Sequence, residues 1–302
     1  MKLHVLIDNL PSLENPCLHH EHGLSLLLQT PEGKNLLVDT GASGKFLENL
    51  EILRQNDSCF PAVEEIDAVM ISHGHNDHTG GLRSFLEANS TAPVYIHSNI
   101  EGNLFFSCRN RGASTTSPGI MEARSIGMEQ SLFAEYSHRF VKISETVSIT
   151  GNITLVPTGD STSTQPMPLG NKYLYKNDFP DNFNHEVAVL AEFAPEHYAV
   201  ISPCSHRGML NILDITSYSC KATHKSMNYF IGGLHYVDYL DKGNAKKEAA
   251  QIVKAAEYIM DHYPHLKVFS GHCTGSAART ILQDTLTESY THFCTGTTIE
   301  LK

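Results

Sequence analysis

The stretch Ile71-Ser72-His73-Gly74-His75-Asn76-Asp77-His78-Thr79-Gly80-Gly81 decides the fold of this chain. It continues the apolar run 68–71, which is typical of a buried strand, and its glycines mark a turn into a helical pattern that starts at Leu82. Four side chains that can bind metal therefore lie on a strand-to-helix loop. They are His73, His75, Asp77 and His78.

The spacing of these four side chains predicts two metal ions. Alternate residues of an extended turn point the same way, so His73 and His75 can bind one ion while Asp77 and His78 reach a second. Neutral imidazoles suit divalent zinc, iron, manganese or nickel, and one carboxylate helps to balance the charge. We expect two divalent metal ions, with zinc preferred over iron, manganese and nickel. The alternative, an incidental histidine-rich surface loop, seldom combines a strand, a glycine turn and ligand spacing.

Further motifs accompany this loop from about residue 20 to about residue 300. They are Glu21-His22-Gly23-Leu24-Ser25, Val38-Asp39-Thr40-Gly41, Cys204-Ser205-His206-Arg207-Gly208, Gly232-Gly233-Leu234-His235 and Gly271-His272-Cys273-Thr274-Gly275. Together they resemble the metallo-β-lactamase superfamily. Within it they are similar to the family of 7,8-dihydropterin-6-ylmethyl-4-(β-D-ribofuranosyl)aminobenzene 5'-phosphate synthases and its unassigned bacterial relatives. The resemblance implies an α/β (α+β) fold: a four-layer αββα sandwich of two mixed sheets with helices outside and metals at one sheet edge.

The resemblance also implies the distant metal ligands. His206 follows a predicted strand at 198–202, where the superfamily places the third histidine of the first metal. His272 follows another at 267–270, where the last histidine of the second metal falls.

His235 departs from the superfamily pattern. It follows a predicted strand at 227–231, where most of the superfamily has an aspartate that bridges both metals, and no carboxylate stands at this turn. Three interpretations remain open. His235 replaces the bridge, or it faces the substrate as a catalytic acid or base, or the second metal is bound weakly.

Asp39 and His22 are candidates for supporting roles. Asp39 ends a buried strand, and the resemblance implies that it hydrogen-bonds a ligand or holds the metal loop, as carboxylates commonly do. The alternative for Asp39 is an Asx turn. His22 precedes a strand on a loop that could overhang the metals, where it either contacts substrate or is a surface residue.

Two regions are candidates for binding a substrate phosphate. Thr274, Gly275 and Ser276 lead into a helix whose free N–H groups would attract an anion, or these residues merely cap the helix. Arg109 and Arg111 either clamp a phosphate, which a guanidinium fork matches, or belong to a solvated loop.

The cysteines indicate a reducing compartment. The chain has 7 of them, an odd number without paired spacing, which argues against a disulfide framework. Cys204 and Cys273 each lie within two residues of a candidate histidine ligand. They either line the metal site, and could touch metal, or are buried small hydrophobic residues.

Composition limits the partners of the chain. Of its 302 residues, 41% are hydrophobic and 18% charged, as in an ordinary soluble globular protein. No apolar run approaches the roughly 20 residues of a membrane span, and the first residues read as a strand, which predicts a cytoplasmic protein. The net charge of -11 disfavours a nucleic-acid surface. We expect a small-molecule substrate and neither nucleic acid nor membrane as partner, and leave open a homo-oligomer.

The apolar pattern predicts the order of the elements in a single domain over residues 1–302. Strand-like runs fall at 3–7, 24–28, 36–38, 69–71, 94–96, 153–156, 186–193, 198–202, 227–231 and 267–269, with an antiparallel-rich first sheet. Helical patterns follow Gly44, span 249–260, and begin at Ser276 as N-cap with Ala277, Ile281 and Leu286 on the apolar face. The segment at about 98–145 has a weak pattern and is interpreted as an insertion over the active-site face.

Two adjacent cations suit hydrolysis, because they lower the pKa of water and polarise a phosphoryl or carbonyl oxygen. We expect a binuclear metal-dependent hydrolase for a small phosphorylated or heterocyclic substrate. In such an enzyme, Asp77 would bind a metal ion and accept the proton of the attacking water, and His206 or His235 would assist departure of the leaving group. The resemblance to the synthases implies an alternative, transfer of a pterin-methyl group from its diphosphate to an arene with release of diphosphate. A non-catalytic metal-binding or sensory protein is a second alternative.

Overall fold

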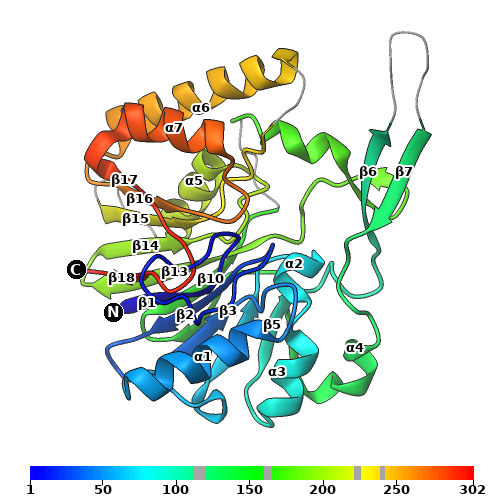
Figure 1. Ribbon diagram of the computed structural model, residues 1–302, viewed down its shortest axis with the longest axis vertical. Helices are drawn as coiled ribbons and strands as arrows, with labels where there is room; N and C mark the ends of the chain where they lie inside the picture. The colour runs from blue at the N-terminus through cyan, green and yellow to red at the C-terminus, as the bar shows by residue number, and fades with distance from the viewer. Residues whose placement is uncertain (112–119, 160–164, 221–225, 239–241) are drawn as a thin grey trace.

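The computed structural model describes residues 1–111, 120–159, 165–220, 226–238 and 242–302 (Figure 1). Within these ranges, no helix combines the length and the apolar character that crossing a membrane requires.

The first sheet has seven strands in the order β18-β1-β2-β3-β4-β5-β8. They are β1 (Lys2–Ile7), β2 (Ser25–Gln29), β3 (Asn35–Val38), β4 (Ala68–Ile71), β5 (Val94–His97), β8 (Phe140–Ile143) and β18 (Thr298–Glu300). Strands β18, β1, β2 and β3 pair antiparallel, whereas β3, β4, β5 and β8 pair parallel. The sheet is therefore mixed rather than antiparallel-rich. Its central strands are apolar because both faces are covered.

The second sheet also has seven strands, in the order β17-β16-β15-β14-β13-β10-β9. They are β9 (Val147–Thr150), β10 (Ile153–Pro157), β13 (Val187–Ala194), β14 (His197–Ile201), β15 (Met227–Gly232), β16 (Lys267–Ser270) and β17 (Tyr290–His292). Strands β14 to β17 run parallel, so their carboxyl ends meet at one edge.

Helices cover the outer face of each sheet (Figure 1). Below the first sheet lie α1 (Lys45–Asn56) and α3 (Leu82–Ala88), and above the second lie α5 (Met209–Cys220), α6 (Lys242–His262) and α7 (Ser276–Leu286). One apolar cluster fills the space between the sheets, and one lies under each helical layer. The predicted αββα sandwich is confirmed.

The region from β6 onward adds a third, smaller sheet in the order β12-β11-β6-β7. Its strands are β6 (Phe105–Arg111), β7 (Ile120–Ser125), β11 (Leu174–Lys176) and β12 (Phe179–Pro180). Figure 1 shows β6 and β7 projecting beside the sandwich. The fold of this region was left open at the sequence level, because the described residues of β7 are exposed and leave no apolar alternation to detect.

The remaining described helices are single turns or little more. They are α2 (Asn76–Thr79), α4 (Leu132–Glu135) and the 3-10 turns η1 (Val63–Glu65), η2 (Ser137–Arg139), η3 (Leu169–Tyr173) and η5 (Thr287–Ser289).

Helix α7 begins as predicted and buries Leu286, but the predicted cap and the other two predicted apolar positions were wrong. Gly275 is the N-cap, and the buried positions are Ala278, Leu282 and Leu286, whereas Ala277 is exposed and Ile281 only half-buried. The buried stripe follows spacings of four residues from Ala278, so starting the pattern one residue early moved the predicted face sideways.

Phe230→Ala tests the core between the second sheet and its helices. Phe230 lies in β15, is fully buried and belongs to this apolar cluster, so its truncation should lower the free energy of unfolding by about 3–5 kcal/mol. Urea denaturation would show this as a lower midpoint at unchanged slope. The control is Phe179→Ala, at a side chain 72% exposed, which should change stability by less than about 0.5 kcal/mol. Equal losses in both variants would contradict this account of the core.

Candidate metal centre

The candidate ligands lie where strands of both main sheets end. Strands β1, β3 and β4 of the first sheet and β14, β15 and β16 of the second deliver them to one edge of the sandwich. The side chains at these ends are Asn9 after β1, Asp39 after β3, His73 and His75 in the loop after β4, Asp77 and His78 in α2 that follows this loop, Cys204 and His206 after β14, His235 after β15, and His272 after β16. Residues up to 264 positions apart thus meet, as the hydrogen bond from the His272 N–H to Asp8 Oδ1 shows.

Three histidines form the first group of candidate ligands, which we call the first triad. His73 Nε2 lies 3.0 Å from His75 Nδ1 and 3.2 Å from His206 Nε2, and all three side chains are buried. Their donor atoms lie within 4.8 Å of one another.

The outer nitrogens of two of these rings are already occupied. Ser72 Oγ donates to Asp39 Oδ2 at 2.6 Å, so it accepts the N–H of His73 Nδ1 at 2.9 Å. His206 Nδ1 donates to Asn171 Oδ1 at 3.0 Å, and the Asn171 amide is oriented by its own bond to the His206 carbonyl, 2.7 Å. With the proton on Nδ1, each ring presents the lone pair of Nε2 to the triad. Two lone pairs about 3 Å apart repel unless a cation lies between them, so the geometry fits a metal ion.

Burial keeps the first triad uncharged. It lowers the pKa of His73 and of His206 well below the usual range, helped by the neighbouring imidazoles, and it lowers the pKa of His75 to about 3. Neutral imidazole is the form that binds metal. His75 Nε2, which points away from the triad, is buried without a hydrogen-bond partner among the described residues.

Asp77, His78 and His272 form the second triad. His78 Nε2 lies 3.0 Å from His272 Nε2, which lies 3.5 Å from Asp77 Oδ2. The outer nitrogens again have acceptors, because His78 Nδ1 donates to Asp39 Oδ2 at 2.6 Å and His272 Nδ1 to Asn9 Oδ1 at 3.0 Å. Asn9 is oriented by its bond to the His272 carbonyl, 3.0 Å. In the second triad, as in the first, outer ring nitrogens donate to fixed acceptors. The second triad has a carboxylate where the first has a third histidine.

The second triad attracts positive charge. Burial alone would raise the pKa of Asp77, but His78 and His272 outweigh it and hold this pKa well below the usual range. Burial likewise lowers the pKa of His272, yet the Asp77 carboxylate and the neighbouring acidic groups outweigh it and raise this pKa to about 9. A site that favours a proton so strongly also favours a divalent cation.

Asp39 is hydrogen-bonded to Ser72, which precedes His73 of the first triad, and to His78 of the second triad. Besides His78 Nδ1, its carboxylate accepts the N–H of Ser72 at 2.7 Å and the hydroxyl of the same residue. Through Ser72 it orients His73, and directly it orients His78. Asp39 thus makes the hydrogen bond to a ligand that the resemblance implied.

Backbone strain concentrates at these strand ends. Asp39, Ser205, His235 and His272 have φ values of 59°, 55°, 49° and 47°, in the left-handed region that side-chain-bearing residues rarely adopt. Such strain persists where surrounding contacts enforce it, and it is common at functional sites.

His235 lies beside the first triad rather than between the two triads. Its ring centroid is 4.1 Å from that of His206, and its donor atoms group with Cys204 and His206. Among the described residues it joins no donor group with Asp77, His78 or His272. This placement favours the acid or base interpretation over the bridging one.

Two cysteines lie at the same centre. The Sγ atoms of Cys204 and Cys273 are 3.3 Å apart without a disulfide, and the His235 N–H donates to Cys273 Sγ at 3.1 Å. Cys204 is buried, which raises its thiol pKa well above the usual range. Both cysteines line the site, one of the two alternatives left open.

A cavity of about 590 Å³ opens over the triads. Ligands such as His75, Asp77 and His272 form one wall, and Ser107, Glu122 and Arg124 of the β6–β7 hairpin form another. The segment predicted as an insertion therefore does reach the site. Arg109 and Arg111 belong to β6, but their side chains lie outside the part of the chain that the structure describes.

His22 also lines this cavity. Its Nε2 lies 3.4 Å from Asp77 Oδ2, and its side chain is 72% exposed. The structure thus places His22 beside the second triad with one face toward solvent, where a substrate could reach it.

The predicted phosphate site at the N-terminus of α7 is wrong in one respect, because the N–H groups there are not free. Asp238 accepts the N–H and hydroxyl of Ser276 and the N–H of Ala277, at 2.9, 3.0 and 3.1 Å. The anion at this helix end is the protein's own carboxylate. The Thr274 hydroxyl accepts the Leu234 N–H at 3.1 Å, and Gly275 lines the cavity.

Sequence reasoning missed the residues that orient the ligands. Asn9 lies two residues after the end of β1, so a search of strand ends could have found it, but Asn171 lies in η3 outside any motif. A buried pair was missed as well: His185 accepts the Gly74 N–H at 3.3 Å and bonds Asp181 at 3.0 Å. Glu186, which accepts two backbone N–H groups of the loop at His206, gave no signal beyond its place in a strand-like run.

The fold and the candidate ligands at this edge of the sandwich point to one class of protein. A sequence model of the metallo-beta-lactamase superfamily matches residues 21–104, which include the histidine loop. The crystal structure of a metal-dependent hydrolase of the beta-lactamase superfamily has a TM-score of 0.72 and 22% identity, covering 100% of this chain and 99% of that chain. The chain has the metallo-β-lactamase fold, and its predicted resemblance to that superfamily is confirmed.

Two relatives from Methanocaldococcus jannaschii narrow the comparison. The 7,8-dihydropterin-6-methyl-4-(beta-D-ribofuranosyl)-aminobenzene-5'-phosphate synthase is 25% identical over 312 residues, 99% of this chain and 96% of the relative. An uncharacterized protein is 23% identical over 273 residues, 90% of this chain and 91% of the relative. The resemblance to the synthase branch is confirmed.

Asp39→Asn tests how the triads are oriented. An amide N–H₂ facing His78 would favour the tautomer with its proton on Nε2, which removes the lone pair that the second triad needs. We expect zinc affinity, measured by competition with a chelating dye, to fall about 10–100-fold. The control is Asp67→Asn, which removes a half-exposed ion pair with Lys34 and should leave affinity unchanged. An unaltered affinity in Asp39→Asn would contradict this role.

Proposed function

We propose that the chain is a metal-dependent hydrolase with a two-metal site. The observation that carries this proposal is the pair of triads, in which the rings of His73, His206, His78 and His272 each direct an Nδ1 proton outward and an Nε2 lone pair inward. Zinc suits this donor set best, and manganese, iron or nickel could also be held by imidazole and carboxylate.

Two divalent cations in such a site would lower the pKa of a water to about 7 and polarise a phosphoryl or carbonyl oxygen. The surrounding residues would supply the rest. Asp77 Oδ2 lies between His272 and His22 and faces the cavity, so it can orient a water and accept its proton. His235, on the cavity wall beside His206, is placed to donate a proton to a departing group.

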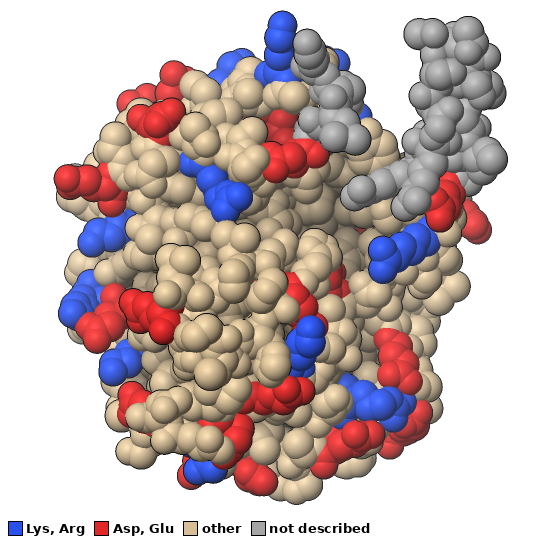
Figure 2. Space-filling model, viewed as in Figure 1, with Lys and Arg blue, Asp and Glu red and all other residues tan. Residues whose placement is uncertain are grey.

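The cavity favours a small substrate. Its volume of about 590 Å³ is in the range of small-molecule sites, and Arg124 is a described cation on its wall that a phosphoryl group could contact. Figure 2 shows acidic and basic side chains interspersed on the described part of this face, rather than a broad basic area. We therefore propose a small phosphorylated or heterocyclic substrate, and no nucleic-acid or membrane partner. Free thiols at the site fit a cytoplasmic location.

Transfer is the second candidate function, because the synthase relative matches the chain nearly end to end. The same residues would then serve a pterin-methyl diphosphate and an arene acceptor, with the metals stabilising the diphosphate that leaves. A non-catalytic metal-binding or sensory role is a third candidate, but the six complete triad ligands give it little support.

His73→Ala tests the metal dependence. The substitution removes the ring that lies closest to both partners of the first triad, so metal content measured by elemental analysis should fall and activity should be lost. His197→Ala is the control, because His197 is exposed on β14 and bonds Asn228. Unchanged turnover in His73→Ala would overturn the proposal.

The choice between hydrolysis and transfer needs two substrates. The zinc-loaded protein is given a phosphodiester and, separately, the pterin diphosphate with its arene partner, both in water enriched in heavy oxygen. Hydrolysis should place the heavy oxygen in the product, as mass spectrometry would show. A joined pterin–arene product with unlabelled diphosphate would instead establish transfer. Absence of turnover with every substrate, despite full metal loading, would favour the non-catalytic role.

A further inference from the structure

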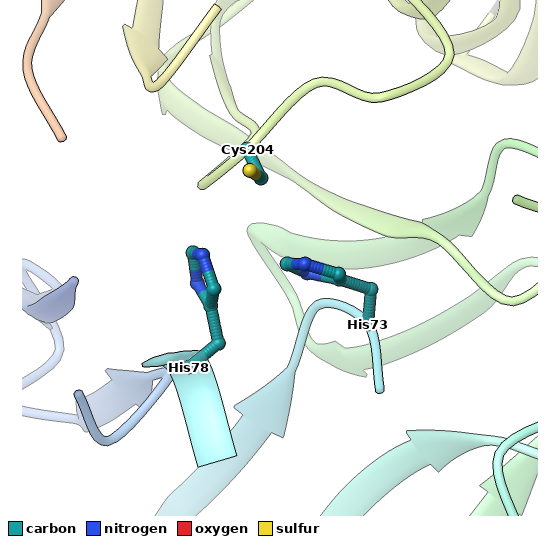
Figure 3. Close-up of side chains that lie close together, drawn as sticks. All are labelled: His73, His78 and Cys204. Carbon is teal, nitrogen blue, oxygen red and sulfur yellow. The ribbon is translucent and has the colours of Figure 1, made fainter. Parts of the chain in front are cut away.

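Cys204 has a position that no other described donor shares. It follows β14 in the turn 202–206, and the left-handed backbone of Ser205 directs the chain back toward the site. Its side chain is buried at the bottom of the cavity. Figure 3 shows it facing the gap between the rings of His73 and His78, which come from the opposite sheet.

The sulfur atom is within reach of both triads. Cys204 Sγ, one nitrogen of His73 and one of His78 all lie within 4.8 Å of one another. Of the groups of three donors that the described residues form, this one alone joins a member of the first triad to a member of the second. Two further groups place the same sulfur with His206 and with His272.

Among the described residues, no carboxylate forms a donor group with members of both triads. The turn after β15 holds His235, which groups with Cys204 and His206 and with no described member of the second triad. Asp77, the carboxylate among the triad ligands, groups with His78 and His272. We infer that the Cys204 thiolate bridges the two metal ions of this site. This inference rests on the two-metal site of the proposed function.

Neighbouring groups are arranged to support a thiolate. Cys273 Sγ lies 3.3 Å and His235 Nδ1 lies 3.6 Å from Cys204 Sγ. Both can donate a hydrogen to the sulfur, as hydrogen-bonded partners of metal ligands commonly do. Cys273 Sγ itself accepts the His235 N–H, which holds it beside the bridge from outside the triads.

A thiolate bridge also narrows the choice of metal. Sulfur ligands favour thiophilic ions such as zinc and iron, whereas carboxylates and water suit manganese and magnesium. The wild-type site, with Cys204, should therefore prefer zinc or iron over manganese more strongly than a variant that has a carboxylate in place of Cys204.

Cobalt replacement tests the bridge by spectroscopy. The full chain is titrated with cobalt(II) chloride under a phosphine reductant, because a thiolate bound to cobalt(II) gives an intense charge-transfer absorption in the near ultraviolet. Wild type should bind two ions and show this band. Cys204→Ser should lose the band. It should also bind the second ion at least about 10–100-fold more weakly, because losing a residue that only hydrogen-bonds a ligand already weakens metal binding by that factor. Cys204→Asp should recover two ions without the band.

Two control variants separate the cysteines. Cys294→Ser, at a thiol bonded to Thr297 outside the site, and Cys273→Ser should both keep the band. Loss of the band in Cys273→Ser alone would overturn the inference by making Cys273 the ligand. Two cobalt ions without a band in wild type would overturn the bridge but leave the proposed function intact. Fewer than two ions in wild type, at saturating cobalt, would overturn the two-metal function and the bridge together.

Discussion

The buried carboxylate of Asp39 is the interaction on which the rest of the site depends. It accepts hydrogen bonds from the backbone and hydroxyl of Ser72 and from His78. These bonds fix the proton positions of His73 and His78, one ring from each triad. A charge buried this deeply is costly unless several donors surround it, so folding of the sandwich and orientation of the ligands are achieved by the same contacts.

Both sheets are needed because neither supplies a full ligand set. The first triad takes His73 and His75 from the loop after β4 and His206 from the loop after β14, while the second takes Asp77 and His78 from α2 and His272 from the loop after β16. The apolar cluster between the sheets therefore sets the distance between ligands. Substitutions in this cluster can alter metal binding without touching a ligand.

The resemblance that the sequence motifs carry allowed the sandwich to be predicted and the six triad residues to be named as candidates, but not the side chains that orient them. A buried strand leaves a run of apolar residues, and His272 was named because it follows such a run where the superfamily places a ligand. Asn171 leaves no such trace, because its bonds to His206 arise from the packing of η3 against a loop 35 residues away. The third sheet was missed for a related reason, since β6 and β7 bury too little to show a period.

The pairing of β18 with β1 bears on the order in which this protein can fold. Lys2 lies opposite Glu300 in that pair, and Asn9, just beyond β1, bonds His272 from 263 residues away. During synthesis β1 can pair with β18 only after the intervening residues have been made, and contacts between residues this distant in sequence form slowly. The second triad, which includes His272, can therefore assemble only late in synthesis.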